Sequence, residues 1–152
     1  MTASDSLGPQ WRIEDHPDPY YPKSTGRVKL AYPADQKGGW PAGRVRYDPE
    51  HESFDDNRTK VVDIKHVGVE PEHQRKGVAR ALYQSIRADH PDTPILHHVD
   101  DQTRAGNSLA RTLSKEDPKG HRWLHFSDGA NGETKRTLKA TPPRRRPTKD
   151  SF

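Results

Sequence analysis

Residues 70–80 (EPEHQRKGVAR) place small residues and positive charges at the start of a predicted helix. The first turn of a helix has backbone N–H groups without partners inside the helix, and the helix dipole adds partial positive charge there. Gly77 has no side chain and Ala79 almost none, so an anionic group can come close to these N–H groups. Three cations surround them, namely Arg75, Lys76 and Arg80. The segment therefore predicts a binding site for a phosphate or pyrophosphate group.

The elements on both sides of this turn are suited to such a site. Residues 59–69 (TKVVDIKHVGV) are rich in β-branched residues and apolar on both faces, which predicts a central strand covered on both sides. Pro71 should end this strand, because proline donates no backbone hydrogen bond. Residues 77–89 predict a helix, with apolar side chains at helical spacing at Val78, Ala79, Leu82, Tyr83 and Ile86.

Shorter segments complete the predicted fold. Residues 26–32 and 40–47 alternate polar and apolar side chains on either side of a turn rich in Pro, Asp and Gly, which predicts a hairpin. After the first helix we expect a strand at 95–99, a helix at 106–113 and a strand at 121–126. An antiparallel start followed by a strand–helix–strand crossover predicts an α+β protein with a mixed sheet and helices packed on it.

The apolar residues are unevenly distributed along the chain. Only 28% of the 152 residues are hydrophobic, against roughly 45% in an ordinary globular domain. Those present concentrate between residues 28 and 126. We therefore expect a domain at 26–128, an irregular Pro-rich arm at 1–25 and a basic, disordered tail at 129–152.

Composition excludes several classes of protein. Without cysteine there can be no disulfide and no zinc site built on thiolates. No stretch approaches the roughly 20 apolar residues that cross a bilayer, and the first ten residues lack the pattern of a secretory signal. We therefore expect a cytoplasmic protein that makes no membrane contact. The net charge of +4 comes from the tail, where seven basic residues and two acidic ones follow residue 132.

The turn at 74–79 resembles the cofactor-binding turn of the GNAT superfamily of acetyl-CoA-dependent N-acetyltransferases. The family pattern is Gln or Arg, two residues, Gly, one residue, then Gly or Ala, and Gln74, Gly77 and Ala79 occupy these positions. Residues 69–72 match the Val-x-Pro-Glu that precedes the pattern in the family. The resemblance covers roughly residues 26 to 126, and the short chain is similar in style to small actinobacterial or bacteriophage members.

The resemblance implies acetyl-CoA as the cosubstrate and no metal. The central strand and the strand at 95–99 would then splay apart to admit the pantetheine arm. The expected cofactor contacts are Val67, Gly68 and Val69 along the strand, Gln74, Arg75, Lys76, Gly77, Val78, Ala79 and Arg80 in the turn, and Asn107 in the second helix. For Asn107 an N-cap of that helix is an equal alternative.

Two residues are candidates for the chemistry. Asp63 lies eleven residues before Gln74, an offset that carries the general base in histone-acetyltransferase-like relatives. Burial in an apolar strand should raise its pKa toward a useful range, whereas a salt bridge to Lys65 is the alternative. Ser114 occupies the position where many relatives carry a tyrosine that protonates the leaving thiolate.

Histidines near these residues offer further chemistry. His66 should point to the opposite face from Asp63, because side chains alternate along a strand, and it is interpreted as a core histidine. His97 or His98 could relay a proton, although surface positions are the commoner interpretation. His121 and His125 lie in a predicted strand, about 13 Å apart, so we expect no metal site there.

Three functions follow from these observations. The first is transfer of acetyl from acetyl-CoA to an amine of a small molecule, peptide or protein. The second is a non-catalytic module of the same fold that binds acyl-CoA, which the replacement of the usual tyrosine by Ser114 favours. The third is association with nucleic acid through the tail, where residues 142–149 read PPRRRPTK, with a solvated arm as the alternative. A homodimer is a further open alternative.

Overall fold

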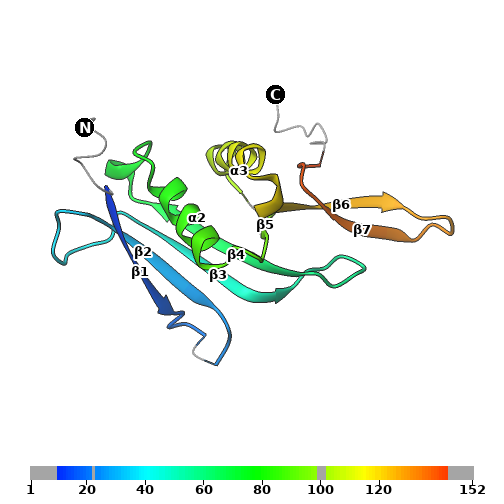
Figure 1. Ribbon diagram of the computed structural model, residues 1–152, viewed down its shortest axis with the longest axis horizontal. Coiled ribbons are helices and arrows are strands. Elements are labelled where there is room, and N and C mark those ends of the chain that lie inside the picture. The colour runs from blue at the N-terminus through cyan, green and yellow to red at the C-terminus, as the bar shows by residue number, and fades with distance from the viewer. Residues whose placement is uncertain (1–9, 22, 99–101, 144–152) are drawn as a thin grey trace.

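The computed structural model describes residues 10–21, 23–98 and 102–143, which form one mixed sheet with helices on one face (Figure 1). The sheet has seven strands in the order of the chain: β1 (Trp11–Pro17), β2 (Arg27–Pro33), β3 (Gly43–Glu52), β4 (Lys60–Val69), β5 (Ile95–His97), β6 (His121–Asp128) and β7 (Thr134–Lys139). The helices are α2 (Val78–Asp89) and α3 (Arg104–Glu116), with short 3₁₀ turns η1 (Pro71–His73) and η3 (Pro118–Gly120).

Strand directions explain why both helices share a face. Strands β1 to β4 are antiparallel, β4, β5 and β6 are parallel, and β7 returns antiparallel to β6. The crossovers β4–α2–β5 and β5–α3–β6 run in the same direction, and right-handed crossovers of that kind place their helices on one side. In Figure 1, α2 and α3 lie together above the sheet, and no described helix covers the other face. The predicted mixed sheet is confirmed.

The core lies between α2 and the first half of the sheet. Along β3, Val45 and Tyr47 are buried while Arg44 and Arg46 are more exposed, so one face of the strand meets the helix and the other does not. The buried cluster joins side chains of β2, β3, β4, β5, α2 and α3, including Ala31, Val45, Tyr47, Val62, Ile64, Leu82, Tyr83, Ile86, Ile95 and Leu113. This packing fixes the position of the turn that precedes α2.

Strands form in both segments that were expected to lack structure. The prediction of an irregular arm is wrong for Trp11–Pro17, because Trp11 and Ile13 pack against the core while Asp15 pairs with the buried Lys29. The prediction of a disordered tail is wrong for Thr134–Lys139, which pairs along its whole length with β6. The basic residues 144–149 lie outside the described residues. The boundaries of the expected domain at 26–128 stay a prediction.

None of the described helices is long and apolar enough to cross a membrane.

Candidate functional site

A gap opens in the sheet where β5 ends. Only two residue pairs join β4 to β5, Val62 with Ile95 and Asp63 with Leu96. Strand β4 then continues to Val69, while β5 stops at His97. Among the residues that the structure describes, the edge of β4 that faces β5 therefore has no strand partner beyond Asp63. This arrangement matches the expected splay, although the carbonyl of Val69 already accepts a hydrogen bond from Nε2 of Gln74 at 3.3 Å.

The turn after β4 presents backbone N–H groups toward solvent. Residues Arg75 and Gly77 have left-handed backbone angles, with φ of 64° and 82°. The first hydrogen bond of α2 runs from the N–H of Ala81 to the carbonyl of Gly77, so the three preceding N–H groups have no partner within the helix. No side chain caps them. A Cβ on Gly77 would meet no atom within 4 Å, so the space above this turn is open to a ligand.

Charges around the turn favour an anion. The side chains of Arg75 and Lys76 are exposed, and neither forms an ion pair within the described part of the chain. Arg80 instead makes a bidentate pair with Glu116 of α3, at 2.9 and 3.3 Å. The N–H groups and two unpaired cations therefore suit the pyrophosphate of a coenzyme A derivative, with Arg80 linking the two helices.

An open depression of about 490 Å³ begins at the same turn. It runs from Lys76 along α2 to Ser85 and is bordered by Gln10 and by Trp11 and Ile13 of β1. The edge of Trp11 rests against the ring of His73, with centroids 5.8 Å apart, which ties β1 to the turn.

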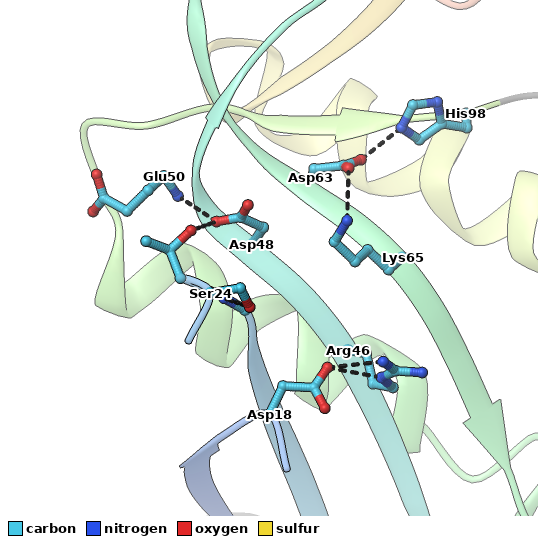
Figure 2. A network of polar contacts seen from close by, with 10 residues as sticks. Asp18, Ser24, Arg46, Asp48, Glu50, Asp63, Lys65 and His98 are labelled. Atoms are coloured by element: carbon cyan, nitrogen blue, oxygen red, sulfur yellow. Dashed lines mark hydrogen bonds and ion pairs between the residues drawn. The ribbon is translucent and has the colours of Figure 1, made fainter. Parts of the chain in front are cut away.

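Asp63 and His98 meet where the two strands part. The Oδ1 atom of Asp63 lies 2.6 Å from Nε2 of His98, which directly follows β5. The other carboxylate oxygen lies 3.9 Å from Nζ of Lys65, so the ion pair considered from the sequence is present but longer than a hydrogen bond. Figure 2 shows Asp63 between His98 and Lys65.

The expected rise in the pKa of Asp63 is wrong. Burial alone would raise that pKa, but the hydrogen bond to His98 and the positive charges of His98, His51 and Lys65 outweigh burial and lower it. Asp63 is therefore an ionised carboxylate at neutral pH, and a weak proton acceptor. Its geometry suits the orientation of a histidine better than proton abstraction from an amine.

A β-bulge changes which side chains share this face. Arg46 pairs with His66 and Tyr47 with Ile64, so Lys65 is an extra residue in β4. Alternation restarts after Lys65, and Val67 and Val69 pack against the core. The prediction for His66 is therefore wrong: its side chain is exposed and lies on the same face as Asp63.

The two other predicted contacts lie in α3. The N-cap of this helix is Thr103, whose side chain accepts a hydrogen bond from the N–H of Gly106, so the N-cap interpretation of Asn107 is wrong. Asn107 is buried in the first turns of α3. Ser114 is also buried, and its Oγ donates to the carbonyl of Ala140 at 2.7 Å and accepts from Nε1 of Trp123 at 3.3 Å.

His97 is a core residue, which corrects the surface position considered for it. It is 1% exposed, and its ring stacks on that of His121 with Nε2 and Nδ1 2.8 Å apart. Burial, followed by the charges of His121 and His98, lowers the pKa of His97 to about 3. Burial is also the main cause that lowers the pKa of His121 to about 4. Of the two adjacent histidines, only His98 reaches Asp63.

No group of three or more His, Cys, Asp or Glu side chains that could hold a metal ion occurs among the described residues.

The fold thus combines a parallel strand pair whose pairing ends early with an uncapped helix N-terminus that follows the longer strand. The chain belongs to the acetyltransferase (GNAT) family, whose model matches residues 3–112. No curated protein sequence matches the chain.

Two solved structures are similar in fold. One is AAC(6')-Iy in complex with the bisubstrate analogue CoA-S-monomethyl-acetylneamine, at 12% identity, with a TM-score of 0.46, covering 71% of this chain and 89% of that one. The other is NAA60 of Arabidopsis thaliana in complex with a bisubstrate analogue, at 15% identity, with a TM-score of 0.49, covering 84% of this chain and 96% of that one.

Proposed function

We propose that this protein transfers an acetyl group from acetyl-CoA to a primary amine, with His98 as the general base and Asp63 as the residue that orients it. The observation that carries the proposal is the hydrogen bond between Asp63 and His98 at the point where β4 and β5 part. Asp63 and His98 thus lie at one end of the gap in the sheet, and the uncapped N-terminus of α2 follows the other end of β4.

The cofactor contacts follow from the same geometry. Backbone N–H groups of Val78, Ala79 and Arg80 hold the pyrophosphate, aided by Arg75 and Lys76. The unpaired edge of β4 at residues 67–69 offers main-chain groups to the pantetheine arm, and the buried Asn107 of α3 is a further candidate contact. Acetyl-CoA supplies an activated acyl group, so a C–N bond forms as the C–S bond breaks and CoA leaves as a thiolate.

The side chains then handle the proton of the amine. Because Asp63 is ionised, Nε2 of His98 donates to it, which fixes the tautomer of the imidazole. In the proposed reaction His98 takes up the proton that the amine loses on attack, and the carboxylate of Asp63 stabilises the resulting imidazolium. Ser114 does not supply the thiolate with a proton in this scheme, because its hydroxyl already donates to Ala140.

Two measurements test the proposal. Acetyl-CoA should raise the melting temperature, since a ligand at a hundred times its Kd adds about 2.7 kcal/mol to the free energy of unfolding. Release of free CoA over a panel of amines should then require His98, and His98→Gln should reduce kcat without abolishing the thermal shift. A His98→Gln enzyme with unchanged kcat at every pH would reject the assigned base.

A non-catalytic acyl-CoA-binding module is the second candidate. The observation that favours it is that the hydroxyl of Ser114 already donates to the carbonyl of Ala140 and accepts from the indole of Trp123. No uncommitted hydroxyl therefore remains at the usual position of the proton donor. A thermal shift with acetyl-CoA, together with no CoA release for any amine, would support this module over the enzyme. A cytoplasmic location, a homodimer and nucleic-acid binding by the tail at residues 142–149 stay predictions.

A further inference from the structure

Tyr83 lies on the side of α2 that faces α3. Residues three and four positions apart share one side of a helix, so Tyr83 shares its side with Arg80 and Arg87. Both arginines reach the C-terminal end of α3, where they form ion pairs with Glu116 and Asp117. The side chain of Tyr83 is therefore directed toward the space between the two helices.

The ring of Tyr83 reaches the sheet where β4 and β5 part. Its centroid lies 5.7 Å from that of His97, the last residue of β5. The last pair between the two strands is Asp63 with Leu96, so His97 is the first residue of β5 beyond that pair. Asp63 lies between two core residues of β4, and its side chain therefore projects from the face opposite to the helices. The gap thus begins with Tyr83 on the helix side of the sheet and with Asp63 and its partner His98 on the other side.

The hydroxyl of Tyr83 forms no hydrogen bond within the described part of the chain. Tyr83 is 3% exposed, and burial is the only cause that shifts its pKa, which it raises. The other deeply buried tyrosine, Tyr47, differs, since its hydroxyl donates to Asp15 at 2.7 Å. Buried polar groups normally have a hydrogen-bond partner. The hydroxyl of Tyr83 is therefore a donor that remains available to a ligand in the gap.

The departing sulfur of acetyl-CoA is an atom that needs such a donor. As the C–N bond forms, the electron pair of the C–S bond moves to the sulfur, so negative charge develops there. Ser114 occupies the sequence position expected to serve the sulfur, but its hydroxyl already donates to Ala140. A donor that is in place before the reaction stabilises developing charge without reorganisation of the site.

We infer that the hydroxyl of Tyr83 donates a hydrogen bond to the sulfur of acetyl-CoA as the C–S bond breaks. This inference rests on the proposed acetyl transfer and adds a catalytic residue to it on the helix side of the sheet, while His98 takes the proton of the amine on the other side. Burial raises the pKa of Tyr83, so the hydroxyl keeps its proton throughout the reaction. The CoA thiolate leaves with the electron pair of the broken bond and takes its proton from water after release.

Tyr83→Phe tests the inference, because it removes the hydroxyl and keeps the ring against His97. Assays of CoA release should give a kcat roughly tenfold lower or less, with the KM for acetyl-CoA close to that of the wild type. The melting temperature should hold, because no hydrogen bond within the protein is lost. Tyr47→Phe is the matched control, since it removes a buried hydroxyl that binds Asp15. It should lower the melting temperature and leave kcat unchanged.

A second measurement follows the thiol of bound CoA without any acetyl transfer. The chain has no cysteine, so the ultraviolet absorbance of a thiolate, after subtraction of the spectrum of the protein alone, comes from CoA. A hydrogen bond to the thiolate favours its charged form. The pKa of the bound CoA thiol should therefore be higher by about one unit or more in Tyr83→Phe than in the wild type. In Tyr47→Phe it should equal the wild-type value.

The outcomes separate the inference from the proposed function. Unchanged kcat and an unchanged thiol pKa in Tyr83→Phe, beside CoA release by the wild type, would overturn the inference and leave acetyl transfer standing. A lower kcat with an unchanged thiol pKa would also overturn it, because the hydroxyl then acts away from the sulfur. A thiol pKa that depends on Tyr83, without CoA release for any amine, would support the contact with the sulfur and reject acetyl transfer. Absence of both CoA release and a thermal shift with acetyl-CoA would overturn the inference and the proposed function together.

Discussion

The carboxylate of Asp63 and the imidazole of His98 lie 2.6 Å apart across the last paired residues of β4 and β5. Asp63 is on the strand that continues toward the predicted cofactor turn, and His98 begins the segment that leaves the sheet. Their hydrogen bond therefore joins the two strands at the point where main-chain pairing ends.

Replacing Asp63 by Asn should lower kcat by roughly 10²- to 10⁴-fold, the usual contribution of a positioned acid–base group. The neutral amide cannot stabilise the imidazolium that forms on His98. Its NH₂ group can also donate to Nε2 of His98, which favours the imidazole tautomer that carries its proton on Nδ1. Asp48→Asn is the control, because Asp48 is the cross-strand neighbour of Asp63 but binds Thr25 instead. Equal losses of kcat in the two variants would indicate that the negative charges on this face of the sheet affect the rate in general, and that Asp63 has no specific role.

Gly77→Ala should weaken acetyl-CoA binding by about tenfold, or about 1.4 kcal/mol. The backbone at Gly77 has a φ of 82°, and a methyl group there would occupy the open space above the N–H groups of α2. Gly38→Ala is a closely matched control, because Gly38 has a φ of 90° and equally open surroundings in the turn between β2 and β3. Both variants should lose about 1–2 kcal/mol of stability from backbone strain.

Calorimetric titration of acetyl-CoA distinguishes the two glycine variants. Only Gly77→Ala should change the Kd, whereas both should lower the melting temperature by similar amounts. A Kd that stays at the wild-type value in Gly77→Ala would mean that the ligand does not approach this turn.

Ser114→Ala should destabilise the protein by about 1–3 kcal/mol, because the hydroxyl joins the carbonyl of Ala140 to the indole of Trp123 in a buried position. For a domain of this size such a loss lowers the melting temperature by several degrees. Denaturant unfolding and CoA release should be measured on the same preparation. A large fall in kcat with wild-type stability would instead restore the catalytic role expected from the sequence position of Ser114.

Acid should destabilise the fold through the stacked pair His97 and His121. The ordinary pKa of histidine is 6.5, and burial lowers it to about 3 for His97 and about 4 for His121. Between these values and 6.5 the unfolded chain binds protons that the folded protein does not. The free energy of unfolding therefore falls as the pH falls through this window, by about 1.4 kcal/mol per pH unit for each histidine.

Denaturant unfolding at several pH values between 4 and 7 measures this slope. His97→Leu should reduce the slope, whatever its effect on stability at pH 7, because one titrating group is removed. The exposed His16→Gln is the comparison variant, because His16 lies outside the buried pair. An equal slope in wild type and His97→Leu would show that acid acts elsewhere.

The elements that carry the predicted cofactor turn were identified from the sequence because their hydrophobic patterns are long. The β-branched run at residues 59–69 and the helical spacing of Leu82, Tyr83 and Ile86 correspond to β4 and α2. The terminal strands β1 and β7 were missed for a physical reason. Pairing with a neighbouring strand satisfies their backbones, while polar and charged residues dominate their side chains.

Side-chain directions in the candidate site were harder to predict. The bulge at Lys65 inserts one residue into β4 and reverses the alternation of side chains after it. His66 was therefore predicted on the face opposite to Asp63, whereas it lies on the same face. Nothing in the residue types around Lys65 signals that insertion. Strand β5 has only three residues, too few for alternation to decide between His97 and His98. Asp63 and His98 were both named as candidates, but their hydrogen bond depends on the register of two strands.

The short pairing between β4 and β5 divides the molecule into two lobes, one made of β1 to β4 with α2 and the other of β5 to β7 with α3. Besides those two rungs and the shared core, the lobes are joined by the hydrogen bond between His98 and Asp63, by ion pairs from Arg80 to Glu116 and from Arg87 to Asp117, and by the contacts of Asp56 with Arg136. A molecule that lies in the gap touches both lobes, so its binding energy adds directly to the energy that holds them together.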